Sequence, residues 1–167
     1  FGRLGCFGQN GVKHPKPQPV KNFGITGLAD ALIFCRARYG GREAVRLTET
    51  WMRTIRDAAY RASVALAHEK GPFPLFNKAD YLDGESISDL PEDIQAGIAE
   101  HGIRNALLTS VAPTGTISLL ADNVSSGLEP VFSLTYTRHV LMPDGLRREE
   151  EVSDHAWRLF RRTFGDN

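Results

Sequence analysis

Residues 111–118 read Val-Ala-Pro-Thr-Gly-Thr-Ile-Ser, and residues 123–130 read Asn-Val-Ser-Ser-Gly-Leu-Glu-Pro. The first stretch has the composition of a turn between a strand and a helix. The chain is mainly apolar from 107 to 112, and Pro113 then removes a backbone donor and fixes φ, as commonly happens where a buried strand ends. Gly115 lets the backbone approach a ligand without a Cβ in the way. We therefore predict a strand over 107–112, followed by a turn that is open to a ligand.

The same turn has the chemistry of a phosphate-binding loop. Its hydroxyl side chains stand beside several backbone N–H groups that are free to donate. A helix over 117–122 would point the positive end of its dipole at the turn and add roughly 0.3 to 2 kcal/mol for a bound anion. The candidate binding residues for a diphosphate are Pro113, Thr114, Gly115, Thr116 and Ile117, with Ser118 directly behind them.

A second interpretation of the turn is purely structural. Thr114 and Thr116 could simply cap the helix, because Ser and Thr satisfy free N–H groups at many helix starts. The spacing alone favours the cap. The chain has neither the Gly-x-x-x-x-Gly-Lys-Ser/Thr loop nor a Gly-x-Gly-x-x-Gly after a strand, so the general nucleotide motifs do not decide between the two.

Both quoted stretches resemble the large, catalytic subunit of ribonucleotide reductases, and the adenosylcobalamin-dependent class most closely. Further blocks match along the chain in the family's order: 26–32, 39–40, 62–67, 70–74, 131–132, 136–138 and 143–145. The resemblance covers about residues 20–165. In that family the loop that matches Pro113 to Ile117 holds the substrate's diphosphate, so the resemblance implies the same role here.

The resemblance also implies a fold. The predicted elements indicate an α/β class with a ligand at the carboxyl end of a strand. The family adds a ten-stranded α/β barrel, of which this chain would form a C-terminal part. We expect residues 21–167 to belong to that barrel domain. Residues 1–20, with four glycines and alternate prolines from 15 to 19, are expected to form a poorly ordered segment.

One part of the family's machinery is missing from the chain. These enzymes use a cysteine radical within an Asn-x-Cys-x-Glu segment and two further cysteines as reductants, and no such segment occurs. Cys6 lies in the Gly-rich start, and Cys35 is expected to be a small buried residue of an apolar helix. We therefore predict no catalytic residue here and expect the chain alone to be inactive.

What the resemblance implies for the complete enzyme is reduction of ribonucleotides to deoxyribonucleotides by radical chemistry. Its cofactor would be adenosylcobalamin. Its partners would be the ribonucleotide substrate, the rest of the catalytic subunit and a thioredoxin-like reductant. Two alternatives stay open: a non-catalytic nucleotide-binding or assembly module, and the iron-dependent class of the same enzyme, whose C-terminal region carries a neighbouring tyrosine pair.

The composition of the chain argues against some kinds of binding partner. The chain has 167 residues, 41% of them hydrophobic, with 20 basic and 20 acidic side chains. This length predicts one domain with a core, and balanced charge gives no general attraction to nucleic acid or to anionic membranes. No apolar run approaches a membrane span. Two cysteines without a secretory segment indicate neither a disulfide framework nor a zinc site, and we expect a cytoplasmic protein.

Apolar periodicity predicts four helices besides the one at 117–122. They cover 27–39, 43–70, 91–101 with Ser88 or Asp89 as cap, and a last helix that starts at the charge run 147–151. The buried side of the last helix is predicted to be Val152, Ala156, Leu159, Phe160 and Phe164.

The remaining segments are predicted as connections and one further strand. Residues 73–76 form an apolar connector against the core, 77–85 a polar loop, 131–141 a strand exposed on one face, and 143–145 a turn. Arg104 and Asn105 precede the predicted strand at 107–112 and are second-rank candidates for a phosphate contact.

Overall fold

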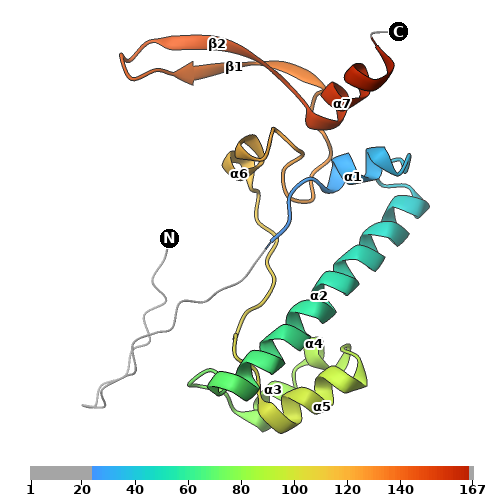
Figure 1. The fold of residues 1–167 in the computed structure, drawn as a ribbon, viewed down its shortest axis with the longest axis vertical. Coiled ribbons are helices and arrows are strands. Elements are labelled where there is room, and N and C mark those ends of the chain that lie inside the picture. Colours follow the sequence, from blue (N-terminus) through green and yellow to red (C-terminus); the bar gives the residue numbers. More distant parts are fainter. Residues whose placement is uncertain (1–23, 166–167) are drawn as a thin grey trace.

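The computed structural model describes residues 24–165, so the predicted segment 1–20 and Cys6 lie outside the described residues. The helices in this range are α1 (Leu28–Phe34), α2 (Arg42–Lys70), α3 (Lys78–Leu82), α4 (Glu85–Ser88), α5 (Glu92–His101), α6 (Gly115–Leu120) and α7 (His155–Phe164), and the strands are β1 (Thr135–Leu141) and β2 (Arg147–Ser153). Helix α2 connects two parts of the molecule: α3, α4 and α5 lie at one end of it, and α1, α6, α7 and the two strands lie at and beyond its other end (Figure 1).

The prediction of a long helix is confirmed in α2. It begins after Gly41 and ends at Gly71, whose φ of 78° suits glycine. Ion pairs between Glu43 and Arg46 and between Glu49 and Arg53 lie on its exposed side. Its buried face carries small side chains, which allow α5 to pack closely against it.

The core at the α5 end contains Ile87, Leu90, Ile94, Ile98 and Ile103, with Phe73 and Phe76 packed on it. The predicted connector at 73–76 and the helix at 91–101 are therefore confirmed. The predicted cap is wrong, because Pro91 takes the N-cap position of α5 while Asp89 ends α4. The predicted loop at 77–85 is also wrong. Asn77 accepts a hydrogen bond from the backbone N–H of Ala79 at 3.0 Å and so starts α3.

A second core joins α1 to the start of α2. It contains Leu28, Leu32, Ala37 and Ala44. The predicted helix at 27–39 is confirmed in α1 but ends earlier, since Arg36 has a φ of 54° and turns the chain. The prediction that Cys35 is buried is wrong, because the shorter helix leaves its thiol exposed at the C-cap position.

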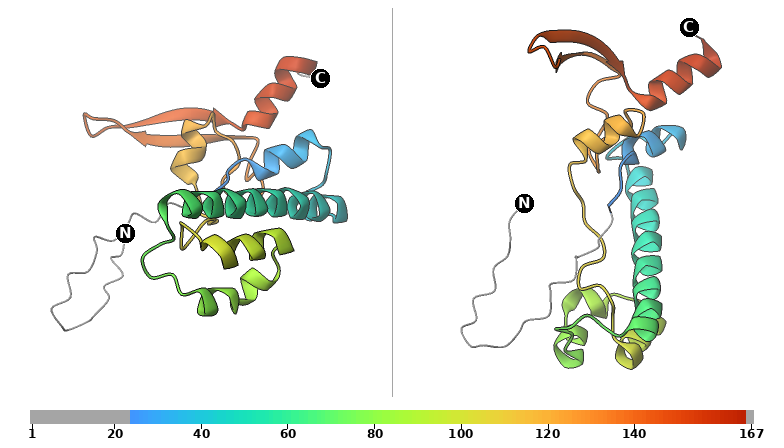
Figure 2. Two further views of the ribbon diagram at one scale, coloured as in Figure 1. Left: turned by 60° about the horizontal axis from the view of Figure 1, so that its bottom comes forward. Right: turned by 60° about the vertical axis from the view of Figure 1, so that its left-hand side comes forward.

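The predicted strand at 107–112 is not formed by the described residues. This segment runs alongside α2 (Figure 2), and Leu107 and Val111 are 60% and 63% exposed. A strand exists through hydrogen bonds to a neighbouring strand, and the described part of the chain provides no ladder here. Helix α6 begins two residues before the predicted range 117–122.

The only sheet within residues 24–165 is the antiparallel hairpin of β1 and β2, paired from Thr135 opposite Ser153 to Leu141 opposite Arg147. The predicted strand at 131–141 is confirmed over 135–141, but the prediction that only one of its faces is exposed is wrong, because no other element of the described chain covers either face. The predicted turn is confirmed too: Met142 donates its backbone N–H to Leu146 O at 2.8 Å, and Gly145 has a φ of 84°.

The prediction that the charge run 147–151 starts a helix is wrong, since these residues belong to β2. The acids of β2 face the basic residues of β1, with Arg138 opposite Glu150 and His139 opposite Glu149. Opposite charges across a strand pair are stabilising. Both strands are largely exposed, and the hairpin projects from the rest of the molecule (Figure 1).

Helix α7 starts at Asp154, whose carboxylate accepts a hydrogen bond from the N–H of Trp157 at 3.2 Å. The predicted buried side is mostly wrong. Ala156 is buried, but Leu159, Phe160 and Phe164 are exposed and Val152 belongs to β2. The helix packs mainly on α1, so only one narrow stripe of α7 is covered.

The described chain thus contains helices and one small sheet and does not close a barrel. Among residues 24–165, no helix is both long enough and apolar enough to cross a membrane.

Candidate nucleotide-binding site

The predicted turn is a sharp bend at Thr114. This residue has φ 48° and ψ 21°, a left-handed conformation that is uncommon for a β-branched residue. Helix α6 follows directly. Among the described residues, no hydrogen bond uses the backbone N–H groups of Gly115, Thr116 or Ile117. These three amides are therefore free to donate to an anion.

The bend is also open in space. A Cβ built on Gly115 meets no atom within 4 Å. Ile117 is 60% exposed, and Thr116 is exposed as well. The structural alternative, in which a threonine caps the helix, is not what the structure shows, because the Thr114 side chain makes no capping hydrogen bond to α6. The Ser118 hydroxyl donates to Gly115 O at 3.0 Å and so braces the first turn.

The Thr114 hydroxyl instead contacts two other segments. It accepts a hydrogen bond from the N–H of Gly127 at 2.7 Å and lies 3.3 Å from the hydroxyl of Thr26. Thr26 in turn donates to Ser125 O at 2.7 Å. These bonds join three segments: the bend, residues 123–130, and the segment before α1, which lies 88 residues from the bend in the sequence.

Ser125 locks the second stretch onto the start of α1. Its Oγ accepts hydrogen bonds from the N–H groups of Ala29 and Asp30 at 3.0 and 3.3 Å. The carboxylate of Asp30 accepts from the N–H of Ser125 at 3.3 Å in return. The arrangement has the reciprocity of a capping box, with its two halves separated by 95 residues.

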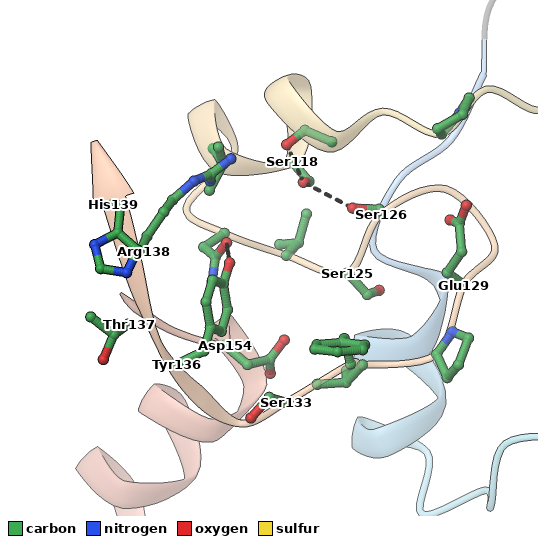
Figure 3. A pocket seen from close by; sticks show the side chains of 18 residues that line it. Ser118, Ser125, Ser126, Glu129, Ser133, Tyr136, Thr137, Arg138, His139 and Asp154 are labelled. Carbon is green, nitrogen blue, oxygen red and sulfur yellow. Dashed lines mark hydrogen bonds between the residues drawn. The ribbon is translucent and has the colours of Figure 1, made fainter. Parts of the chain in front are cut away.

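An open cavity of about 940 Å³ lies beside the bend. Pro113 and Gly115 line it, whereas Thr114, Thr116 and Ile117 do not. The other walls come from α6, from residues 123–133, from β1 and from Asp154. Figure 3 shows Ser118 and Ser126 hydrogen-bonded to each other on the wall of this cavity, with oxygens 3.3 Å apart, and Arg138 and His139 on the neighbouring strand.

Most of the cavity wall therefore comes from residues outside the predicted binding residues 113–118. Ser126, Glu129 and Arg138 are among them. Ser126 and Glu129 belong to residues 123–130, which follow the bend closely in the sequence. This short separation was the sequence signal that they could lie near it. Arg138 belongs to the matching block 136–138, whereas Asp154 carries no local signal and reaches the cavity only through the folding of the chain.

Two buried carboxyl groups, of Asp30 and Asp154, lie close together beside this cavity. Asp30 and Asp154 are 3% and 4% exposed, and Asp30 Oδ1 has no N–H or O–H donor among the described residues. Burial, together with the nearby charge of Asp154, raises the pKa of Asp30 to about 6. The nearby Asp154 carboxyl group therefore favours the protonated form of Asp30, at the point where α1 approaches the start of α7.

Asp122 and Asn123 attach α7 and the hairpin to the same region. The His155 ring and the Arg158 guanidinium lie 2.8 and 2.6 Å from the Asp122 carboxylate, and their hydrogen bonds lower the pKa of Asp122. Asn123 donates from its amide to Ser153 O at 2.8 Å, and its side-chain oxygen accepts from the Tyr136 hydroxyl at 3.3 Å.

The second-rank candidates lie elsewhere. Arg104 donates to the carbonyl groups of Lys70, Gly71 and Pro72 and thereby caps the end of α2. Asn105 exchanges hydrogen bonds with the Ser63 side chain at 3.0 Å. Neither residue lines the cavity at the bend.

Comparison with known proteins shows which family this chain is similar to. The family model described as "Ribonucleotide reductase, barrel domain" matches residues 21–157. The vitamin B12-dependent ribonucleoside-diphosphate reductase of Mycobacterium tuberculosis is 41% identical over 118 residues, which cover 71% of this chain and 15% of that protein. The protein of the same name from Thermoplasma acidophilum is 38% identical over 118 residues, covering 71% and 13%.

A more distant relative carries a different name. The ribonucleoside-diphosphate reductase large subunit of Caenorhabditis elegans is 34% identical over 131 residues, which cover 72% of this chain and 16% of that protein. The chain thus spans between 13% and 16% of the length of these relatives.

Proposed function

Because this chain belongs to the ribonucleotide reductase barrel-domain family, we propose that the bend at residues 113–117 binds the diphosphate of a ribonucleotide substrate. The observation that carries the proposal is the set of three unused amides at Gly115, Thr116 and Ile117. A tight bend that aims consecutive N–H groups outward favours an anion. The adjoining cavity of about 940 Å³ provides room for the rest of a nucleotide.

Each residue of the bend has a distinct part in this proposal. Gly115, Thr116 and Ile117 donate backbone N–H groups, and the exposed Thr116 hydroxyl adds a fourth donor. Pro113 stiffens the approach to the bend because its φ is fixed. Hydrogen bonds to a charged group contribute about 1.5 to 3 kcal/mol each. The role of the bend is to hold and orient the substrate.

The chemistry of reduction belongs to the complete enzyme in this proposal. That enzyme would reduce the ribonucleotide by radical chemistry, with the reducing cysteines, a thioredoxin-like reductant and the rest of the catalytic subunit supplied from outside this chain. We expect the chain alone to bind nucleotide weakly and to catalyse no reduction. Cys35 does not replace the missing cysteine, since it lies at the end of α1 and does not line the cavity.

Adenosylcobalamin is the proposed cofactor of the complete enzyme, where it would supply the initial radical. The relatives whose names state vitamin B12 dependence are 38 to 41% identical, against 34% for the large subunit from Caenorhabditis elegans. This difference favours the cobalamin class over the iron-dependent class. The cavity next to the bend carries serine hydroxyl groups and Arg138 on a largely apolar wall, and we assign no corrin contact to residues 24–165.

Titration of the chain with inorganic pyrophosphate, followed by amide NMR shifts, tests the site. We expect wild-type chain to show saturable shifts at Gly115, Thr116 and Ile117. Gly115→Glu should weaken binding at least about tenfold, because a carboxylate would stand where the anion binds. Gly115→Gln is the matched control of equal size without charge, and Gly115→Ala is the small control; both should lose less.

Two results would contradict the proposal. One is the absence of shifts at 115–117 in wild-type chain at saturating pyrophosphate. The other is equal binding by wild type and Gly115→Glu. A non-catalytic module would still bind, so nucleotide reduction by the complete enzyme separates it from the enzyme.

A further inference from the structure

Thr26 lies 88 residues from the bend and contacts it through a side-chain hydrogen bond. The residue is half-buried in the segment before α1. Its hydroxyl donates to Ser125 O at 2.7 Å and lies 3.3 Å from the hydroxyl of Thr114. Neither of these contacts is local, so only the folded chain brings the two threonines together.

The direction of the hydrogen bonds follows from proton number. A threonine hydroxyl has one proton and can accept through its lone pairs. The Thr26 proton goes to Ser125 O, so the bond between the two hydroxyl groups must use the proton of Thr114. The Thr114 oxygen is then an acceptor for the N–H of Gly127 at 2.7 Å. The Thr114 hydroxyl therefore has no proton left for a ligand.

The same bonds explain why α6 is not capped. A threonine at the N-cap commonly accepts from the N–H groups two or three residues later, here Thr116 and Ile117. Thr26 and Gly127 hold the Thr114 hydroxyl away from those amides, and no capping bond forms. They also hold Thr114 in its left-handed conformation, which a β-branched residue adopts only when its surroundings require it.

We propose that Thr26 is a positioning residue of the diphosphate-binding bend, because it accepts a hydrogen bond from the Thr114 hydroxyl and so keeps the amides of Thr116 and Ile117 free for the anion. This inference rests on the proposed function of the bend. It assigns Thr26 no contact with the substrate, since it acts only through Thr114.

The test compares Thr26→Val with Thr26→Ser in the full 167-residue chain. Thr26→Val has the shape of threonine and lacks the hydroxyl, whereas Thr26→Ser keeps it. We expect pyrophosphate binding to weaken about tenfold in Thr26→Val, the equivalent of one hydrogen bond to a charged group. Binding should be retained in Thr26→Ser. Thr54→Val, on the exposed face of α2, is the control for loss of a threonine hydroxyl elsewhere and should bind as wild type does.

Amide hydrogen exchange supplies a readout that a general loss of stability would not produce. In Thr26→Val the Thr114 hydroxyl keeps only its bond from Gly127, and its proton no longer has Thr26 as acceptor, so we expect the hydroxyl to rotate toward α6 and the amides of Thr116 and Ile117 to exchange more slowly than in wild type. Partial unfolding would instead speed exchange throughout the chain. In a Thr114→Val background the Thr26→Val change should have no further effect on binding, because the group through which it acts is absent.

The outcomes separate this inference from the proposed function. If Gly115→Glu weakens pyrophosphate binding while Thr26→Val binds normally and leaves exchange at 116 and 117 unchanged, the role of Thr26 is wrong and the binding site stands. If wild-type chain binds no pyrophosphate, the proposed function is wrong, and Thr26 has no substrate site to position. Equal losses in Thr26→Val and Thr26→Ser would also overturn the role of its hydroxyl.

Discussion

Gly115 and Gly127 lie on facing segments, yet their surroundings differ. Gly127 has a φ of 44°, and a Cβ there would stand 2.6 Å from Ala112 O and 2.9 Å from the Glu129 carboxylate. Gly115 faces open space. Gly127 is therefore required by the close approach of two backbone segments, whereas Gly115 leaves the space in front of the bend free for a ligand.

We predict that Gly127→Ala lowers the free energy of unfolding by about 2 to 4 kcal/mol, because the side chain adds both a clash and backbone strain. Gly115→Ala is the matched control and should change the same quantity by less than about 0.5 kcal/mol. Urea unfolding of both variants measures the difference. Equal midpoints for Gly127→Ala and wild type would show that residues 112 and 127 do not approach as the structure has them.

Thr114 shows the limit of sequence reasoning at this scale. Its position at a turn before a helix was visible from Pro113 and Gly115. The destination of its hydroxyl was not, because the partners Thr26 and Gly127 are 88 and 13 residues away. Ser125 is a similar case, since a serine in a loop gives no sign of which helix it will cap.

At the scale of elements, the packing of α5 on α2 holds one end of the molecule together. Ile98 is 0% exposed in the core at this end. A Cβ on Gly97 would lie 3.0 Å from Val64 Cγ1, which shows how closely the two helices approach.

We predict that Ile98→Ala lowers the free energy of unfolding by about 2 to 5 kcal/mol, the usual range for a large-to-small change in a packed core. Val45→Ala, on the exposed side of α2 at 60% exposure, should be neutral or slightly stabilising. Chemical denaturation followed by circular dichroism measures both. A loss below about 1 kcal/mol in Ile98→Ala would contradict the packing described for this core.

The elements that sequence analysis located best are the helices with long local patterns. Helices α2 and α5 were found to within a residue or two because apolar spacing and terminal glycines act within the helix itself. Strands were found less well. The run 147–151 becomes β2 because β1 offers it a ladder and opposite charges, and residues 107–112 have no such neighbour among the described residues.

At the scale of the whole molecule, the buried pair of Asp30 and Asp154 joins the two ends of the described chain. Burial raises the pKa of Asp30 from 3.8 to about 6, with a further contribution from the charge of Asp154. The folded chain therefore keeps a proton that the unfolded chain releases between these pH values. The free energy of unfolding must fall as pH rises through this window, by at most about 3 kcal/mol.

We predict that this fall disappears in Asp30→Asn, which keeps an acceptor for the N–H of Ser125 and cannot ionise. Urea unfolding between about pH 4.5 and 7.5 measures the slope. Asp93→Asn is the control: a hydrogen bond from Arg61 lowers the pKa of Asp93 below its ordinary value of 3.8, so its own titration lies under this window. A wild-type stability that is flat or rises over this range would contradict the raised pKa of Asp30.

The described chain leaves large apolar side chains on its surface. Leu120 and Phe132 are 90% and 98% exposed, and the hairpin of β1 and β2 has both faces largely uncovered. Isolated hairpins are marginally stable in water, and unpaired strand edges favour association with other strands. This surface is consistent with a chain that spans 13 to 16% of the length of its relatives.

Local sequence was sufficient to identify the family, to locate the long helices and to mark the bend at 113–117. Each of these depends on residues close together in the chain: apolar periodicity, proline and glycine at turns, and a run of short motifs. Folding was needed to show that the amides of the bend are free, that Thr26 and Gly127 engage Thr114, and that Arg138 and Asp154 reach the cavity. These features depend on contacts between residues far apart in the chain, for which no local pattern exists.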